Sequence, residues 1–336
     1  MIIRKFGSSF EVADYTGEVL MIPNQWGLLN QSGLFMDEGV SEYSVQFEQT
    51  TKDGALIVDK VRGERASAGK DSTSKLFSWA VPHFPYDDAI FPQDIKGKRA
   101  YGSADQEETL AAVRARKLAR IVQNHAWTLE YARFQLLTAG TVYAPNGTVS
   151  MNYFTEMGVS QTVVNFDLAT STTDVISKVE AVISSIQDNA SGENVQSVIG
   201  YCSPGFFAAL ISHANVKAAY TYYASTQDPL RSRLGGNTAM YRTFDYAGIQ
   251  FVEVRGNYAG NLFIPAKDAV FVPVGTSSFL TFTAPANKFD LLGTVGERVY
   301  AFEYPSERGD KIVIESEANF LNACTRPALI VRGYTA

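Results

Sequence analysis

The sequence predicts an elongated α+β protein built around one long helix. Three observations carry this prediction. Residues 43–100 read as extended chain, residues 103–140 read as a single helix, and residues 249–331 return to strand patterns. Strand signals and the main helix signal thus occupy largely separate stretches of the chain, as in an α+β protein.

The composition is that of an ordinary globular chain. Of 336 residues, 46% are hydrophobic and 19% are charged, which suits one large domain or two smaller ones. The net charge of −6 argues against a protein whose main task is to hold duplex DNA, because such proteins neutralise phosphates with Lys and Arg. The two cysteines, Cys202 and Cys324, lack CxxC spacing and fit a reducing compartment.

The sequence shows no signal peptide and no membrane-spanning segment. The first ten residues lack the apolar core of a signal peptide. No stretch approaches the roughly 18 apolar residues that a membrane span requires. We therefore expect a soluble protein that is made in the cytoplasm.

The first hundred residues predict an arm followed by a hairpin. Residues 1–42 show no sustained period and are interrupted by Gly, Asn and Ser, as expected for an arm that orders against another surface. Tyr43, Val45 and Phe47 then alternate with polar residues, residues 50–54 predict a turn, and residues 56–58 resume the strand. Two prolines keep residues 80–85 extended.

The long helix has clear end signals. Residues 103–106 match a capping box, and acidic residues follow in the first turn, where the helix dipole favours them. Apolar residues recur at helical spacing as far as Leu137, and Gly140 is a typical C-terminal stop. At 1.5 Å per residue this helix would span on the order of 50 Å, which predicts a rod.

The rest of the chain predicts shorter elements. Residues 142–153 form a hairpin with its turn at Asn146-Gly147, and a helix begins near Thr173. A strand at 195–202 leads into a helix with Ser203 as N-cap and Pro204 in its first position. Another helix covers 215–223 and a loop covers 227–238. Strands are expected at 249–254, 269–274, 279–283, 298–304, 311–316, 320–324 and 328–331.

The chemistry of a catalytic site is missing. His83, His125 and His213 have no partner at metal-ligand spacing, which predicts structural or solvated histidines in place of zinc ligands. Cys202 and Ser203 lie at a strand-to-helix turn, but neither has the glycines of a nucleophile elbow in register. No phosphate-binding loop is present. We therefore expect no catalytic residue, no cofactor and no metal.

Four strings, in this order, resemble the lambda-type major capsid (head) protein family of tailed bacteriophages. They are AVPHFPYDD at 80–88, YCSPGFF at 201–207, FIPAKDAV at 263–270, and the closing strands at 298–304 with 319–329. The resemblance covers about residues 39–331 and implies the Hong Kong 97 phage capsid fold. It divides the chain into an N-terminal arm (1–42), an extended loop or long β-hairpin (43–100), a peripheral domain with spine helix and hairpin (101–172), an axial domain (173–290) and return strands completing the peripheral domain (291–336).

The resemblance implies a major capsid protein that self-assembles as pentamers and hexamers into an icosahedral shell around double-stranded phage DNA, without sequence-specific binding. Expected partners are other copies of the chain, a separate scaffold protein, a portal and a possible decoration protein. The expected location is the virion capsid, assembled in the host cytoplasm. The extended loop would cross a neighbouring subunit and contact it through Tyr43, Phe47, Leu56 and Ile57. The alternative is that these four residues pack into the chain's own core.

Two other functions remain open at this point. An encapsulin-like nanocompartment shell would have the same fold and would hold cargo enzymes in place of DNA. An α/β hydrolase-like enzyme would use the turn at Cys202-Ser203, and would need a histidine and an acid to converge there.

Overall fold

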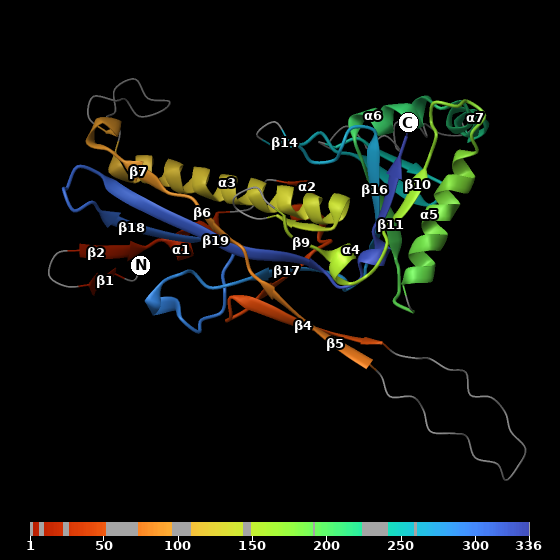
Figure 1. Cartoon of the computed structure of the whole chain (residues 1–336). Coiled ribbons are helices and arrows are strands. Elements are labelled where there is room, and N and C mark those ends of the chain that lie inside the picture. The colour runs from red at the N-terminus through yellow and green to blue at the C-terminus, as the bar shows by residue number, and fades with distance from the viewer. Residues whose placement is uncertain are drawn as a thin grey trace, which may run out of the picture.

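The computed structural model describes residues 3–6, 10–22, 27–51, 73–95, 109–143, 149–190, 192–223, 241–258 and 261–335. They form an elongated body in which two sheets are joined by one long helix, and a hairpin leaves the body on one side (Figure 1). Among these residues no helix is both long enough and apolar enough to cross a membrane.

The first sheet contains eight strands in the described part of the chain. Six follow the order β1-β2-β18-β19-β17-β3, and β6 and β7 also pair with β19. Its centre is β19, a single thirteen-residue strand where the sequence predicts two shorter ones. The strands are β1 (Ile3–Phe6), β2 (Phe10–Asp14), β3 (Met36–Gly39), β6 (His83–Pro85), β7 (Asp88–Ile90), β17 (Phe279–Thr283), β18 (Tyr300–Pro305) and β19 (Ile312–Cys324).

The second sheet has the order β10-β20-β16-β11-β13-β12, and α5, α6 and α7 pack around it. Its core is rich in phenylalanine, including Phe166, Phe251 and Phe271, all fully buried. The elements are β10 (Thr162–Asn165), α5 (Val175–Asn189), β11 (Ser197–Cys202), α6 (Pro204–Ser212), α7 (Ala214–Tyr223), β12 (Thr243–Tyr246), β13 (Ile249–Glu253), β16 (Asp268–Val274) and β20 (Val331–Tyr334).

The long helix is α3 (Leu110–Ala139), which we call the spine helix. The Thr109 side chain caps its first turn by accepting a hydrogen bond from the backbone N–H of Ala112. The predicted cap at 103–106 lies outside the described residues. The predicted end is confirmed, because Gly140 adopts the left-handed conformation with φ 64°. The spine helix lies along β19, and both run towards the second sheet (Figure 1).

The projecting hairpin consists of β4 (Ser44–Thr51) and β5 (Thr73–Ala80). Strand β4 continues through Thr51, so the turn predicted at 50–54 begins later than expected, and the strand predicted at 56–58 lies outside the described residues. The base of the hairpin is anchored by Trp79, whose ring packs edge-on against Tyr153 at 4.9 Å between centroids. The Tyr153 hydroxyl donates to the backbone oxygen of Asn322 in β19 at 2.7 Å.

Shorter elements connect these parts. They are α1 (Thr16–Met21), α2 (Leu28–Ser32), β8 (Thr141–Tyr143), β9 (Val149–Asn152), α4 (Tyr153–Glu156), β14 (Asn257–Tyr258), β15 (Asn261–Leu262) and the 3-10 turns η2 (Pro92–Asp94), η3 (Phe289–Leu291) and η4 (Pro327–Leu329). The helices predicted near 173 and 203 are confirmed, as are both strands of the hairpin at 142–153, whose turn lies outside the described residues. The loop predicted at 227–238 also lies outside them.

The expectation of an irregular arm is wrong for its described part. Strand β2 pairs with β18, and β3 pairs with β17, so the arm adds strands to the first sheet at two places. These elements contain only four to six residues each, which is too short to show a period in the sequence. The partners of β2 and β3 in β18 and β17 lie more than two hundred residues away, and no local signal reveals that pairing.

Most strands of the expected axial region (173–290) lie in the second sheet, and β18 and β19 of the return strands (291–336) lie in the first. Three strands depart from this division. Strand β17 belongs to the first sheet, whereas β10 and β20 belong to the second. For β20 the cause is the turn η4, which redirects the chain after β19 so that its last strand inserts between β10 and β16.

Candidate subunit-contact surface

Large hydrophobic side chains remain exposed at several places on the described surface, and three groups of them are candidate contacts. The hairpin exposes Tyr43 (45%) and Leu76 (65%), and the edge strand β3 exposes Met36 (55%). The loop between β17 and β18 exposes a third group, listed here with exposed fractions: Phe289 91%, Leu292 60% and Val295 63%. Clustered apolar exposure of this kind marks surfaces that contact another macromolecule.

The four predicted contact residues have different environments. Tyr43 is exposed at the start of the hairpin, so its ring is available to a partner. Phe47 is half-buried and packs against its own chain, with ring centroids 4.5 Å from Trp79 and 5.4 Å from Phe282. Leu56 and Ile57 lie outside the described residues.

A buried carboxylate ties the arm to the spine helix. Glu130 of the spine helix is 1% exposed and accepts the backbone N–H groups of Leu29 (2.8 Å) and Asn30 (2.9 Å) at the start of α2. These N–H groups have no partner within their own helix, so the carboxylate acts as a cap supplied from another helix. Burial raises the pKa of Glu130, and its backbone hydrogen bonds and Arg133 oppose that rise.

Arg133 extends this anchor one turn further along the spine helix. Its buried guanidinium donates to Asp37 in β3 at 2.5 Å, to Thr281 in β17 at 2.9 Å and to the side-chain oxygen of Asn30 at 3.0 Å. Sequence reasoning missed both Glu130 and Arg133. The available signal was an acid and a base three residues apart, on the buried side of a helix.

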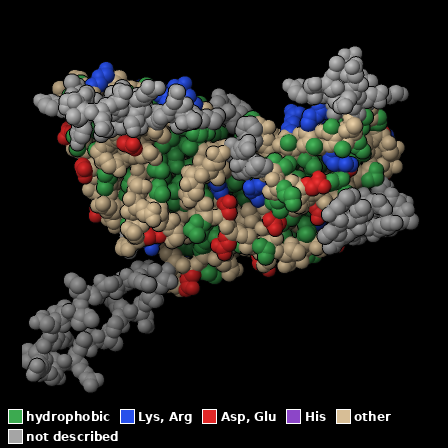
Figure 2. Space-filling model, turned by 180° about the vertical axis from the view of Figure 1, so that it is seen from behind, with side chains coloured by type: hydrophobic (Ala, Val, Ile, Leu, Met, Phe, Trp, Pro, Cys, Tyr) green, Lys and Arg blue, Asp and Glu red, His purple; other side chains and the backbone are tan. Residues whose placement is uncertain are grey.

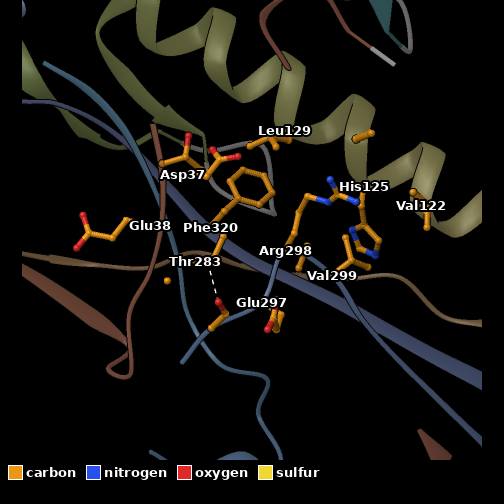
Figure 3. A pocket seen from close by; sticks show the side chains of 15 residues that line it. Asp37, Glu38, Val122, His125, Leu129, Thr283, Glu297, Arg298, Val299 and Phe320 are labelled. Carbon is orange, nitrogen blue, oxygen red and sulfur yellow. Dashed lines mark hydrogen bonds between the residues drawn. The ribbon is translucent and has the colours of Figure 1, made fainter. Parts of the chain in front are cut away.

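A cavity of about 230 Å³ lies between the spine helix, β3 and residues 296–299 (Figure 3). Val122, His125 and Leu129 line it from the spine helix, and Phe320 of β19 lies opposite. The remaining lining residues include Asp37, Glu38, Ala126, Glu297, Arg298, Val299 and Ala318. The space is therefore apolar towards the helix and bordered by carboxylates towards β3.

His125 is neutral in this environment. Burial lowers its pKa from 6.5 to about 4. The Ser316 hydroxyl donates to the backbone oxygen of Tyr86, so its oxygen accepts a hydrogen bond from Nε2 of His125 at 3.0 Å. The imidazole is thus a packed structural group, which agrees with the sequence interpretation.

The strand-to-helix turn at Cys202 does not assemble a nucleophile. The Ser203 hydroxyl caps α6 by accepting the N–H of Phe206. Cys202 is fully buried, and burial raises its pKa well above the ordinary value. The ring nitrogens of the three histidines contact residues other than Cys202 and Ser203. His83 contacts Asn319 and Glu317, and His125 contacts Ser316. His213 contacts Thr170 and Asn215. In the described ranges no three His, Cys, Asp or Glu side chains gather as a metal site would require.

Charge is unevenly spread over the surface. On the face drawn in Figure 2, basic side chains lie mostly toward the upper border, and acidic side chains lie over the middle and lower parts. Hydrophobic side chains are interspersed between them. The described residues of this face therefore offer mixed polar and apolar contacts and form no continuous basic track of the kind that holds nucleic acid.

Comparisons with known proteins agree with one another. A family model described as phage major capsid protein E matches residues 11–335. The major capsid protein of Pseudomonas phage KPP10 is 43% identical over 349 aligned residues, covering 99% of both chains. A capsid protein structure from an Escherichia coli CFT073 prophage matches with a TM-score of 0.63 at 10% identity, covering 97% of this chain and 99% of that one. The mature capsid of bacteriophage PhiM1 matches with a TM-score of 0.56 at 13% identity, covering 93% and 87%.

Proposed function

Because the chain belongs to the phage major capsid protein E family and has the Hong Kong 97 capsid fold, it is a shell-forming structural protein, and we propose that it assembles as pentamers and hexamers into an icosahedral shell around double-stranded DNA. The second sheet with its helices is the proposed axial domain at the capsomer centres. The first sheet with the spine helix is the proposed peripheral domain.

The projecting hairpin is the observation that best supports this arrangement. Strands β4 and β5 leave the body and pair with each other only, among the strands that the structure describes (Figure 1). An isolated two-stranded hairpin is only marginally stable in water, so β4 and β5 would gain stability by resting on another molecule. Tyr43 and Leu76 supply exposed apolar area for that contact.

The ring contacts of Phe47 support the alternative that the sequence left open, packing into the chain's own core. Its ring holds the hairpin to the chain's own core beside Trp79 and Phe282. We therefore propose Tyr43 as a contact to the neighbouring subunit and Phe47 as the residue that fixes the angle at which the hairpin leaves the body. Leu56 and Ile57 stay proposed contacts.

The remaining partners are proposed from the family resemblance. They are a separate scaffold protein, a portal, a possible decoration protein and the enclosed DNA, with assembly in the host cytoplasm. The net charge of −6 suits a wall around DNA better than a protein that grips it. We also infer that the chain has no catalytic role, a proposal supported by the capped and buried turn at Cys202-Ser203.

Sedimentation and electron microscopy test the proposal. The purified chain, alone and co-expressed with its phage's other head proteins, should yield fast-sedimenting shells or capsomer rings. Nuclease-protected double-stranded DNA in particles from infected cells would support a phage capsid over a nanocompartment that holds cargo enzymes. A chain that stays monomeric under both conditions and in high salt would contradict shell assembly.

A further inference from the structure

The loop between β17 and β18 presents an apolar surface on a fixed backbone. We call residues 284–299 the knob loop, because Phe289, Leu292 and Val295 project from it. Its backbone is tied down at Gly296, whose N–H donates to Val40 at 2.9 Å and whose carbonyl oxygen accepts from Thr283 at 3.0 Å. Since the loop is already ordered, little conformational entropy is lost when its apolar side chains become covered.

A second tie fixes the side of the loop that carries Phe289. The ammonium group of Lys288 contacts Glu315 of β19 at 2.6 Å, and the backbone N–H of Asn287 donates to Glu317 at 3.1 Å. Phe289 follows immediately, yet 91% of it is exposed. Its ring therefore does not fold back onto the chain's own core.

The cavity beside the spine helix can accept such a ring. Its volume of about 230 Å³ exceeds the roughly 150 Å³ at which an apolar cavity binds benzene. Val122, Ala126, Leu129 and Phe320 give it apolar walls, and the knob loop itself contributes Gly296 through Val299 to its lining (Figure 3). The same loop thus carries the projecting ring near its start and borders the receiving cavity with its last four residues.

We propose that Phe289 of one copy enters this cavity of a neighbouring copy, so that the knob loops link subunits head to tail. The inference rests on the proposed shell, in which every copy is surrounded by identical copies. A contact between two different sites on identical subunits forms a closed cyclic assembly when the rotation between subunits permits. Each copy then inserts its Phe289 side chain into one neighbour and accepts the Phe289 side chain of another.

The edge of the first sheet supports this docking direction. Strand β3 borders the cavity through Asp37, Glu38 and Gly39, and all four of its residues are exposed. In the described part of the chain β3 pairs with β17 on one side and with no strand on the other. A neighbouring loop that arrives there can also bond to the open backbone of this edge.

Cysteine cross-linking tests the contact directly. Cys202 and Cys324 are both fully buried, so the background of disulfide formation is low. Two single variants, Phe289→Cys and Glu38→Cys, are mixed, assembled and oxidised. We expect a disulfide-linked dimer that joins position 289 of one chain to position 38 of the other, identified by non-reducing gel and mass spectrometry. The control mixture pairs Phe289→Cys with Glu180→Cys, an exposed position on α5, and should give no such dimer.

The alternatives give different results. Shells that form without a 289–38 disulfide, or that give mainly 289–289 disulfides, overturn the inference while leaving the shell itself intact. If the unmodified chain forms no shell under any condition, the proposed function fails first.

A substitution pair supplies a second measurement. Phe289→Asp should lower the yield of assembled particles by about tenfold or more, because each lost contact is repeated around the shell. Met21→Asp changes another highly exposed apolar residue (84%), which lies outside the knob loop and the cavity lining, and should leave the yield unchanged. Equal yields from Phe289→Asp and the unmodified chain would contradict a role of this ring in assembly.

Discussion

Glu130 and Arg133 place two charges inside the body, where single substitutions have large effects. Each is nearly fully buried, and together they hold α2, β3 and β17 against the spine helix. A buried charge is tolerated only while its partners remain, because the lone partner keeps the full cost of its lost hydration.

Glu130→Ala should therefore destabilise the subunit by about 3 kcal/mol, since it uncaps α2 and leaves Arg133 with fewer partners. Denaturant unfolding of unassembled subunits measures the free energy of unfolding. Glu180→Ala on the exposed face of α5 is the matched control and should change that free energy by less than about 0.5 kcal/mol. An equal, small effect of both substitutions would show that the arm is not anchored at Glu130.

His125 should make stability depend on pH. Its pKa is about 4 when folded and 6.5 when unfolded, so the unfolded chain gains a proton first as the pH falls. Stability from this residue is complete above pH 6.5 and decreases between pH 6.5 and 4, by at most about 3 kcal/mol. The raised pKa of Glu130 acts in the opposite direction, because protonation in acid suits its buried site.

Comparison with His125→Gln isolates the histidine. The variant should lose less stability than the unmodified subunit between pH 6.5 and 4.5, as measured by denaturant midpoints at each pH. Parallel curves for the two proteins would mean that His125 titrates similarly in the folded and unfolded states.

At the level of elements, the end of the spine helix depends on one glycine. Gly140 has φ 64°, and a Cβ added there would lie 2.4 Å from the ring of Phe154. Gly158 also has φ 64°, but a Cβ there would meet nothing within 4 Å. The two glycines share the backbone conformation and differ in the space around it.

Gly158→Ala should thus cost about 1 kcal/mol for the left-handed backbone alone. Gly140→Ala should cost that amount plus about 1–3 kcal/mol for overpacking against Phe154. Thermal unfolding of both variants under identical conditions separates the two contributions. Equal losses would indicate that Phe154 moves aside without cost.

The elements also show which features of the fold could be predicted from the sequence. The spine helix end, the cap at Ser203 and the hairpin at 142–153 were predictable because their signals are local: a glycine stop, a serine followed by proline, and an Asn-Gly turn. The pairing of β3 with β17 and the insertion of β20 into the second sheet were not, because they join residues far apart in the chain. The anchor at Glu130 was missed for the same reason, since its partners lie about one hundred residues earlier.

For the whole molecule, the question is whether an exposed residue serves folding or assembly. Tyr43 is 45% exposed, so nearly half of its surface is open to a partner and the rest lies against its own chain. Tyr43→Asp should lower the unfolding free energy of the isolated subunit by no more than about 1 kcal/mol while reducing particle yield several-fold. Tyr43→Phe, which keeps the ring, should assemble normally. A larger loss of subunit stability in Tyr43→Asp would instead place this residue in the chain's own core.

The parallel course of the spine helix and β19 also has a mechanical meaning. The helix contains thirty residues and the strand thirteen, and each rises by roughly 40–45 Å without interruption. The two run as adjoining struts, one held by hydrogen bonds within itself and the other by hydrogen bonds to its neighbours. A force applied at the second sheet is therefore transmitted to the far end of the first sheet with little deformation of the elements between them. Pressure on one part of a wall built from such subunits would be felt as a displacement at the edges of each subunit, where its neighbours begin.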